Sequence, residues 1–192
     1  SLQKLFYEFK VLGFTHVVME VSSHALDQYR VADINFNFAI FTNLTPEHLD
    51  YHPSMEAYYQ AKSRLFKMLT IDGVAIINSS DLNGERIAKE TVATVLYFSK
   101  GNGDTIHFSN ADSNLGGIKG VIKAGDFSYK INSNLIGDFN KENILASVSV
   151  LHAIGLGNEA IANGINSCTS IPGRLEIFKL STGAKVVMDY AH

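Results

Sequence analysis

The chain is 192 residues long, carries a net charge of −3, and is 46% hydrophobic and 18% charged. These values predict an ordinary soluble globular protein with one sizeable domain, or one domain with part of another. They exclude a global basic field that would attract nucleic acid or anionic lipid. The single cysteine, Cys168, excludes an intramolecular disulfide and a multi-cysteine zinc site, and it fits a cytoplasmic location. No stretch has the length and apolar character of a membrane span.

Helices and strands alternate in the first part of the chain. Apolar residues at helical spacing predict a helix that begins near Leu2 and ends at Gly13. A strand is predicted at His16–Val21. The run Phe38–Phe41 is typical of a strand buried on both faces, as in a parallel sheet. Ser54 then has the side chain that caps the start of the next helix.

The same alternation continues through the middle of the chain. Strands are predicted at Gly73–Asn78 and Thr94–Phe98, with a helix at Gly84–Glu90 between them. Strands that alternate with helices are typical of βαβ units, so the fold class is α/β with a parallel sheet.

Residues 99–137 have a different character, because glycine and asparagine are frequent and apolar residues tend to alternate with polar ones. This pattern predicts a small antiparallel β insert with a hairpin turn at Ala124-Gly-Asp126. Helical patterning returns at Lys141–Ile154 and at Glu159–Asn166, and Ala184–Asp189 begins a new strand. The sequence stops three residues after that strand, so we expect a truncated C-terminal domain.

Lys62 occupies an unusual position in the helix that follows Ser54. Its neighbours three and four positions away are all apolar or aromatic: Tyr58, Tyr59, Leu65 and Phe66. Lys62 therefore lies within the predicted buried stripe, where an ammonium is costly unless it is paired, neutralised or modified. The alternative is a lysine at the edge of the stripe, whose stem packs on apolar surface while its head reaches water.

Two other polar residues are expected at the carboxyl ends of strands, the edge where ligands bind in open α/β sheets. Glu20 interrupts the strand predicted at His16–Val21, and His48 lies in the loop after the strand Phe38–Phe41. Glu20 has an alternative as a buried acid satisfied by backbone donors, and His48 and His52 have alternatives as loop-packing residues. Together with Lys62, on consecutive βα units, Glu20 and His48 indicate a functional site.

Several segments resemble the central domain of the Mur ligases, with the MurE type as the best match. They follow one another in order through nearly the whole chain: Met19-Glu-Val-Ser-Ser-His24, Phe41-Thr-Asn-Leu-Thr-Pro-Glu-His-Leu-Asp-Tyr-His52, Tyr59-Gln-Ala-Lys62, Gly137-Asp-Phe-Asn-Lys-Glu-Asn143 and Ile171-Pro-Gly-Arg-Leu-Glu176, which leads to Asp189-Tyr-Ala-His192. The resemblance implies a P-loop-ATPase-like α/β domain. It also implies a parent enzyme of peptidoglycan synthesis that consumes ATP and joins an amino acid to UDP-N-acetylmuramoyl-dipeptide through an acyl phosphate.

The resemblance implies catalytic roles for three residues. Glu20 would ligate one Mg²⁺ between the nucleotide phosphates, and His48 would help to bind a second Mg²⁺ near the acyl carboxylate. Lys62 stands fourteen positions after His48, as the MurE pattern expects, and matches the family lysine that reacts with CO₂ to form a carbamate. The chemistry is consistent, because a desolvated lysine has a lowered pKa and more of it is the neutral amine that attacks CO₂.

Binding roles are implied for a second set of residues. Ser22, Gln28 and Arg30 match positions that hold the UDP-muramoyl substrate. The guanidinium of Arg30 suits phosphate or carboxylate, although its alternative is an ordinary surface residue.

Four further residues match positions that contact ATP. Asn140 and Asn143 match an asparagine pair that contacts adenine, and simple helix capping is their alternative. Arg174 and Asp189 match groups that reach phosphate and ribose when the C-terminal domain closes.

One family motif is absent from the sequence, the phosphate loop G-x-x-G-K-T/S. We therefore expect residues 1–170 to form a central domain without its phosphate loop, and residues 171–192 to form a linker and the first strand of a C-terminal domain. We also expect this polypeptide to be inactive alone.

Other interpretations remain. The parent is alternatively a folylpolyglutamate or cyanophycin synthetase relative, although the string His48-Leu-Asp-Tyr-His52 favours the MurE type. A non-catalytic sugar-nucleotide-binding remnant is a second alternative. The residues leave open whether diaminopimelate, lysine or another amino acid is added.

Overall fold

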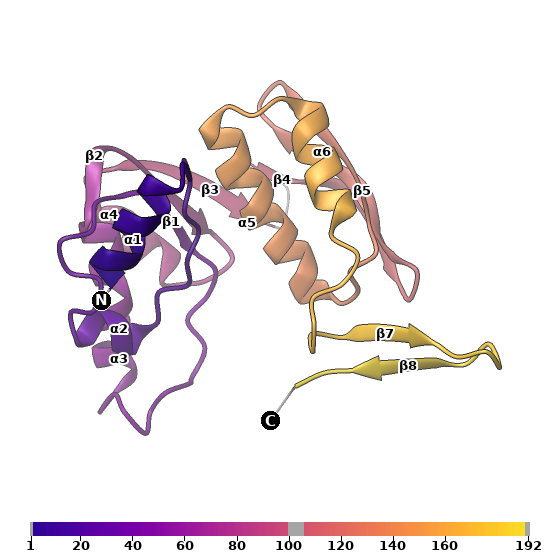
Figure 1. Cartoon of the computed structure of the whole chain (residues 1–192), viewed down its shortest axis with the longest axis horizontal. Helices are drawn as coiled ribbons and strands as arrows, with labels where there is room; N and C mark the ends of the chain where they lie inside the picture. The colour runs from indigo at the N-terminus through magenta and orange to yellow at the C-terminus, as the bar shows by residue number, and fades with distance from the viewer. Residues whose placement is uncertain (1, 100–105, 191–192) are drawn as a thin grey trace. The chain divides into compact units, whose positions relative to one another are not determined.

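A computed structural model describes residues 2–99 and 106–190 of the chain (Figure 1). In chain order the elements are α1 (Leu2–Val11), α2 (Ser23–Asp27), β1 (Phe36–Phe41), α3 (Met55–Lys67), β2 (Leu69–Asn78), α4 (Gly84–Glu90), β3 (Thr94–Ser99), β4 (Ile106–Asn114), β5 (Gly117–Ala124), β6 (Phe127–Ser133), α5 (Asp138–Ile154), α6 (Asn158–Ser167), β7 (Glu176–Lys179) and β8 (Lys185–Met188). None of the helices in these ranges is long and apolar enough to cross a membrane.

The strands form two sheets. Six of them follow the order β1-β2-β3-β4-β5-β6, while β7 and β8 form a separate antiparallel pair. Strand β3 pairs with β4 in parallel, and β4, β5 and β6 pair antiparallel. The predicted α/β class with a small antiparallel insert is therefore confirmed.

The chain divides into two compact units. The first unit comprises Ser1–Ala39, Leu44–Ala75 and Arg86–Thr94, and the second comprises Ile40–Asn43, Ile76–Glu85 and Val95–His192. The predicted site residues numbered below 63 lie in the first unit, and those from Asn140 onward lie in the second.

Helix α3 organises the first unit. Ser54 has extended backbone angles, and its hydroxyl accepts a hydrogen bond from the amide of Ala57, so it caps the helix as its sequence position predicted. The inner face of α3 buries Tyr58, Tyr59 and Phe66. The Tyr59 hydroxyl donates a hydrogen bond to Glu90 at 2.7 Å, which joins α3 to the end of α4.

The segment before α2 departs from the prediction. A strand was expected at His16–Val21, but residues 14–22 have no regular structure, and the Val18 side chain is 97% exposed. A strand needs a neighbouring strand to satisfy its backbone groups. In the described residues β1 is the edge strand of the six-stranded sheet, and residues 14–22 do not pair with it. The expectation that Phe38–Phe41 is buried on both faces is also wrong, because Ile40 is exposed between buried Ala39 and Phe41.

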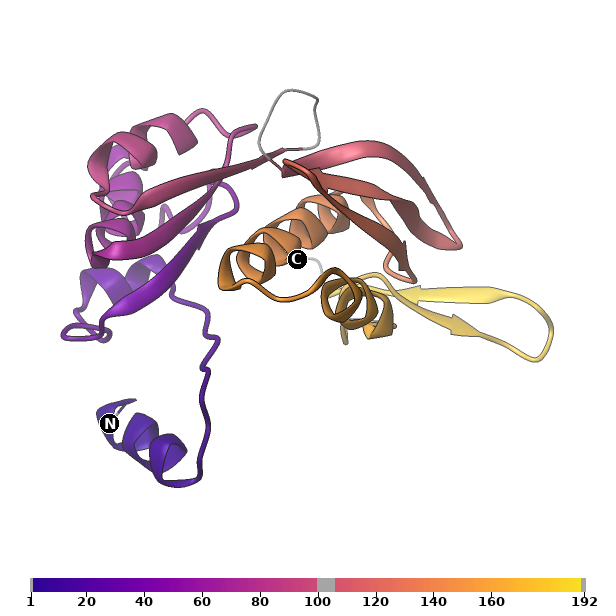
Figure 2. The same ribbon diagram turned by 90° about the horizontal axis from the view of Figure 1, so that it is seen from above.

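The second unit contains the β insert and the helices that cover it. Strands β4, β5 and β6 form a meander with α5 against β4 and β5 (Figure 2). The hairpin predicted at Ala124-Gly-Asp126 is confirmed, since Ala124 pairs with Phe127 and Gly125 adopts φ +56°. Part of the predicted insert, residues 100–105, lies outside the described residues.

The last helices follow the predicted pattern, but the strand β7 in the segment expected to be a linker was not predicted. Helix α5 ends at Gly155, which is left-handed, and the amide of Asn132 on β6 donates to Asn166 on α6 at 2.7 Å. Strand β8 realises the strand expected at Ala184–Asp189. The division at residue 170 into two domains stays a prediction.

Candidate functional site

A tight turn presents His48 in the first unit. The His48 carbonyl accepts hydrogen bonds from the amides of Tyr51 at 3.1 Å and His52 at 2.9 Å. His48 itself has φ +57°, a left-handed conformation that histidine adopts more readily than most residues with a side chain. Its imidazole is exposed and therefore open to a ligand.

Aromatic rings from three segments surround this turn. The His24 ring lies 5.1 Å from the His48 ring and 4.0 Å from the Tyr51 ring, measured between centroids. Helix α2 supplies His24, the turn at residues 48–52 supplies His48, Tyr51 and His52, and α3 supplies Tyr58. We name the set His24, His48, Tyr51, His52 and Tyr58 the imidazole–tyrosine cluster.

His52 is the buried anchor of this cluster. Its Nε2 lies 2.9 Å from the Ser23 hydroxyl, and its ring stacks on Tyr58 at 5.2 Å with an angle of 19° between the planes. Burial lowers the pKa of the His52 imidazole, and the charge of a protonated His24 lowers it further. His52 is therefore biased toward its neutral form, in which one ring nitrogen donates and the other accepts.

Lys62 lies one helical turn after Tyr58 and is half-buried. Its Nζ is 5.4 Å from the centre of the Tyr58 ring, within the range of a cation–π contact. The side chain thus lies at the boundary of the apolar stripe on α3, as the simpler sequence interpretation expected. Its nitrogen nevertheless shares the Tyr58 ring with His48, whose ring centre is 5.8 Å from that of Tyr58.

Glu20 lies apart from secondary structure, in the irregular segment before α2, and its side chain is exposed. The alternative of a buried acid satisfied by backbone donors is therefore wrong. Within residues 2–99 and 106–190 no three His, Cys, Asp or Glu side chains are grouped so that they could hold a metal. Any Mg²⁺ here would need ligands besides these side chains. That need is ordinary for Mg²⁺, which is usually held by one or two carboxylates with substrate phosphates and water.

The three predicted substrate residues flank helix α2. The Ser22 hydroxyl caps the helix by accepting from the amide of Ala25 at 3.1 Å. Arg30 donates to the Gln28 side-chain oxygen at 2.5 Å, and Gln28 donates to the Tyr51 hydroxyl at 3.3 Å. Gln28 and Arg30 are therefore brought together and tied to the turn that carries His48.

An acidic side chain supports this link. The Tyr51 hydroxyl donates to Asp27 at 3.0 Å, and Arg64 on α3 contacts the same carboxylate at 3.1 Å. The chain of bonds from Arg64 through Asp27 and Tyr51 to Gln28 thus joins α3, α2 and the turn.

The predicted adenine residues lie on α5 in the second unit. Asn140 is buried, its amide donates to the Ile136 carbonyl at 2.8 Å, and its side-chain oxygen accepts from Asn143 at 3.1 Å. Gly137 occupies the N-cap position before α5, and Asn140 lies inside the helix, so the capping alternative for Asn140 is wrong. Asn143 is exposed beside it.

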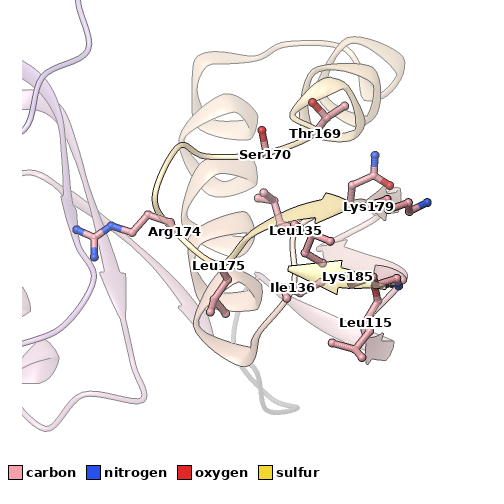
Figure 3. A pocket seen from close by; sticks show the side chains of 12 residues that line it. Leu115, Leu135, Ile136, Thr169, Ser170, Arg174, Leu175, Lys179 and Lys185 are labelled. Carbon is pink, nitrogen blue, oxygen red and sulfur yellow. Dashed lines mark hydrogen bonds between the residues drawn. The ribbon is translucent and has the colours of Figure 1, made fainter. Parts of the chain in front are cut away.

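Arg174 and Asp189 lie on either side of the β7–β8 hairpin. The Asp189 carboxylate accepts from the amide of Leu175 at 2.9 Å, which closes the base of the hairpin. Arg174 is exposed and lines a cavity of about 270 Å³ in the second unit (Figure 3). The cavity is lined by Leu115, Gly116, Asn134, Leu135, Ile136, Thr169, Ser170, Arg174, Leu175, Ile177, Lys179 and Lys185.

The sequence interpretation missed most of the imidazole–tyrosine cluster. It selected His48, regarded His52 as a possible loop-packing residue and Tyr58 as part of the buried stripe of its helix, and assigned no functional role to His24, Tyr51, His52 or Tyr58. The four-residue spacing of His48 and His52, and the position of His24 directly after two serines, were available signals. Their meeting depends on contacts between α2, the turn and α3, which no local pattern specifies.

Comparisons with a family model and with curated proteins point to the same family. Residues 1–151 match the model of the Mur ligase middle domain. The chain is 39% identical over 198 residues to the UDP-N-acetylmuramoyl-L-alanyl-D-glutamate–2,6-diaminopimelate ligase of Geobacter metallireducens, and 41% identical over 193 residues to that of Gloeobacter violaceus. Each match covers 100% of this chain and 39% of the relative, so the chain spans about two fifths of their length.

Solved structures agree with the sequence matches. A structure of a UDP-N-acetylmuramoyl-L-alanyl-D-glutamate–2,6-diaminopimelate ligase is similar with a TM-score of 0.87 at 29% identity, over 100% of this chain and 40% of that one. A MurF structure from Acinetobacter baumannii has a TM-score of 0.72 at 20% identity, over 80% of this chain and 33% of that one, and supports the fold alone.

Proposed function

This chain belongs to the Mur ligase family, through its middle domain, and from this premise we propose that it is the ATP-using part of a UDP-N-acetylmuramoyl-dipeptide ligase. The complete enzyme would convert a substrate carboxylate to an acyl phosphate and pass the acyl group to an incoming amino acid. The family resemblance expected from the sequence is confirmed; the substrates and partners of the whole protein are part of the proposal.

The observation that carries the proposal is the sequence match with diaminopimelate ligases over the whole chain. Relatives 39% and 41% identical bear that same name, and each match covers 100% of this chain. They favour a UDP-muramoyl substrate over the folate and cyanophycin alternatives. They also favour diaminopimelate as the amino acid that the complete enzyme adds. With ATP and UDP-linked precursors as substrates, we assign the protein to the cytoplasm.

We assign Mg²⁺ binding to Glu20 and His48. The carboxylate of Glu20 is the hard oxygen donor that Mg²⁺ prefers, and both side chains are exposed, so phosphates and water can supply the remaining ligands. When bound, Mg²⁺ would supply neutralisation of phosphate charge. His48 is a less usual ligand for so hard an ion, and its contribution is the weaker of the two.

We assign Lys62 the role of a carbamate-forming residue. It is half-buried and lies beside the Tyr58 ring. The neutral amine is the form that attacks CO₂, and formation of the carbamate releases a proton. The resulting carbamate would replace a partly buried cation with an anion able to accept hydrogen bonds.

The remaining predicted residues would bind the two large substrates. Gln28 and Arg30 are held together by a hydrogen bond, and the guanidinium of Arg30 suits a phosphate or carboxylate of the UDP-muramoyl peptide. The Ser22 hydroxyl already accepts a hydrogen bond as the cap of α2, so we expect it to make at most one additional hydrogen bond to the UDP-muramoyl substrate. The exposed Asn143 would contact adenine, and the buried Asn140, which accepts a hydrogen bond from Asn143, would hold it in position. Arg174 and Asp189 would contact phosphate and ribose.

A hybrid enzyme tests this function. Residues 1–192 would replace the matching segment of the Geobacter metallireducens ligase, and ATP-dependent joining of diaminopimelate to UDP-N-acetylmuramoyl-L-alanyl-D-glutamate would be measured by mass spectrometry. We expect activity, and we expect Lys62→Arg to abolish most of it because arginine cannot form the carbamate. Lys67→Arg, on the same helix but exposed, is the matched control and should keep activity. A folded hybrid that binds neither ATP nor the UDP substrate would refute the proposal.

A further inference from the structure

Two buried polar side chains meet in the first unit without an assigned role. Ser23 and His52 are each 4% exposed, and they are joined by the 2.9 Å contact between the serine hydroxyl and Nε2. Burying polar groups costs free energy unless they bond to one another, so this pair specifies one relative position for its two segments. Those segments are the first turn of α2 and the end of the 48–52 turn, 29 positions apart in the sequence.

The bond also fixes the His52 ring against α3. His52 stacks on Tyr58 at an interplanar angle of 19°, a nearly parallel arrangement that leaves the ring little freedom to rotate. Tyr58 is 4% exposed, so it is itself held by the core. Ser23, His52 and Tyr58 therefore form a continuous support from α2 through the turn to α3.

Both reactive side chains of the proposed site lie against this support. The His48 ring meets Tyr58 edge-on, at 5.8 Å and 87°, and the Lys62 Nζ is 5.4 Å from the same ring. The carbonyl of His48 is in addition bonded to the amide of His52 at 2.9 Å. A movement of His52 would therefore displace His48 through the backbone, and would also displace Tyr58, which borders Lys62.

We propose that Ser23 and His52 are a positioning pair that, through Tyr58, fixes the separation of His48 and Lys62. This inference rests on the proposed function, because the separation of His48 and Lys62 matters only if both act on the same substrate. In the bound state the imidazole of His48 and the carbamate of Lys62 would have to face the same substrate group. Groups behind a metal site commonly act in this way, by restricting the orientation of the ligands in front of them.

The test uses the 192-residue chain with ¹³C-labelled histidine and lysine side chains. NMR signals of His48 and Lys62 are identified with His48→Asn and Lys62→Arg. We expect Ser23→Ala and His52→Phe each to shift both signals, although neither substitution alters His48 or Lys62 itself. The double variant should differ little from either single variant, because both remove the same bond. Mn²⁺, used as a Mg²⁺ substitute, should bind about tenfold more weakly to the variants.

A matched control separates positioning from loss of stability. Ser149 is also fully buried, and its hydroxyl donates to the Leu145 carbonyl at 2.7 Å within α5 of the second unit. Ser149→Ala makes the same chemical change and should leave the His48 and Lys62 signals in place. Thermal melting of every variant verifies that the folded state is being compared.

The outcomes distinguish this inference from the proposed function. Unmoved His48 and Lys62 signals in folded Ser23→Ala and His52→Phe would overturn the positioning pair, as would additive effects in the double variant. Failure of the wild-type chain to form a carbamate signal with ¹³C-bicarbonate would count against the proposed role of Lys62 instead. Whether or not Lys62 forms a carbamate, the shifts of the His48 and Lys62 signals test whether Ser23 and His52 position these two side chains.

Discussion

At the scale of single residues, the buried imidazole of His52 makes the stability of the first unit dependent on pH. Burial lowers the pKa of His52 below its ordinary value, His24 and His48 lower it further, and Asp27 and Asp50 partly oppose them. An unfolded chain keeps the ordinary pKa of about 6.5. The unfolded state therefore takes up a proton first as the pH falls. The contribution of neutral His52 to the unfolding free energy is complete above a pH of about 6.5, the pKa in the unfolded chain. It is lost as the pH falls from there toward the lowered pKa of the folded state.

We expect the wild-type chain to lose more unfolding free energy than His52→Phe between pH 7.5 and pH 5.5. Urea denaturation followed by circular dichroism at the two pH values measures the difference. Phenylalanine keeps the ring that stacks on Tyr58 but has no proton to gain. His16→Phe, which makes the same substitution at an exposed histidine of the first unit, serves as the control. Equal losses in the wild type and His52→Phe would contradict the prediction.

At the scale of elements, helix α3 depends on Ser54, the residue that caps its start. The Ser54 hydroxyl accepts from the Ala57 amide at 3.1 Å and satisfies one of the free donors at the helix start. We expect Ser54→Ala to lower the unfolding free energy by about 1 kcal/mol, measured by urea denaturation. Ser147→Ala, inside α5, is the comparison, because alanine is the better helix former there. A smaller loss for Ser54→Ala than for Ser147→Ala would show that the cap contributes little.

The same elements show what local sequence can predict. Ser54, Gly155 and the Ala124–Phe127 turn were identified correctly because caps and tight turns depend on a few adjacent residues. The strand expected at His16–Val21 failed for the opposite reason: its residues have strand character, but a strand forms only against a neighbour. Its apolar pattern contains no information about whether that neighbour is present.

The candidate site divides in the same way. Lys62 was found because its position on one helix conflicts with the apolar pattern around it, and that conflict is local. His24 and His52 were missed because their importance comes from contacts with Ser23, Tyr58 and one another across segments far apart in the sequence. Glu20 and His48 were selected from their places near the ends of expected strands, and the family resemblance then gave them roles; the tertiary contacts supplied the residues that support His48.

At the scale of the whole molecule, the β7–β8 hairpin contributes no fully buried side chain to a core. Its strands pair with each other and with no strand of the six-stranded sheet, and every residue of β8 is exposed. Helix α6 differs, because Ile161 is fully buried and Asn166 accepts a hydrogen bond from β6. The two segments are neighbours in sequence but should contribute unequally to stability.

Two shortened chains measure this difference. A chain of residues 1–170 loses the hairpin, and we expect it to melt within about 4 °C of the full chain, which corresponds to about 1 kcal/mol at this size. A chain of residues 1–157 also loses α6 and the buried Ile161, and removal of such a side chain alone costs roughly 2–5 kcal/mol. Its melting temperature should therefore fall well beyond that of the longer chain. If both chains melted equally low, the hairpin would be part of the core, and a domain boundary at residue 170 would be wrong.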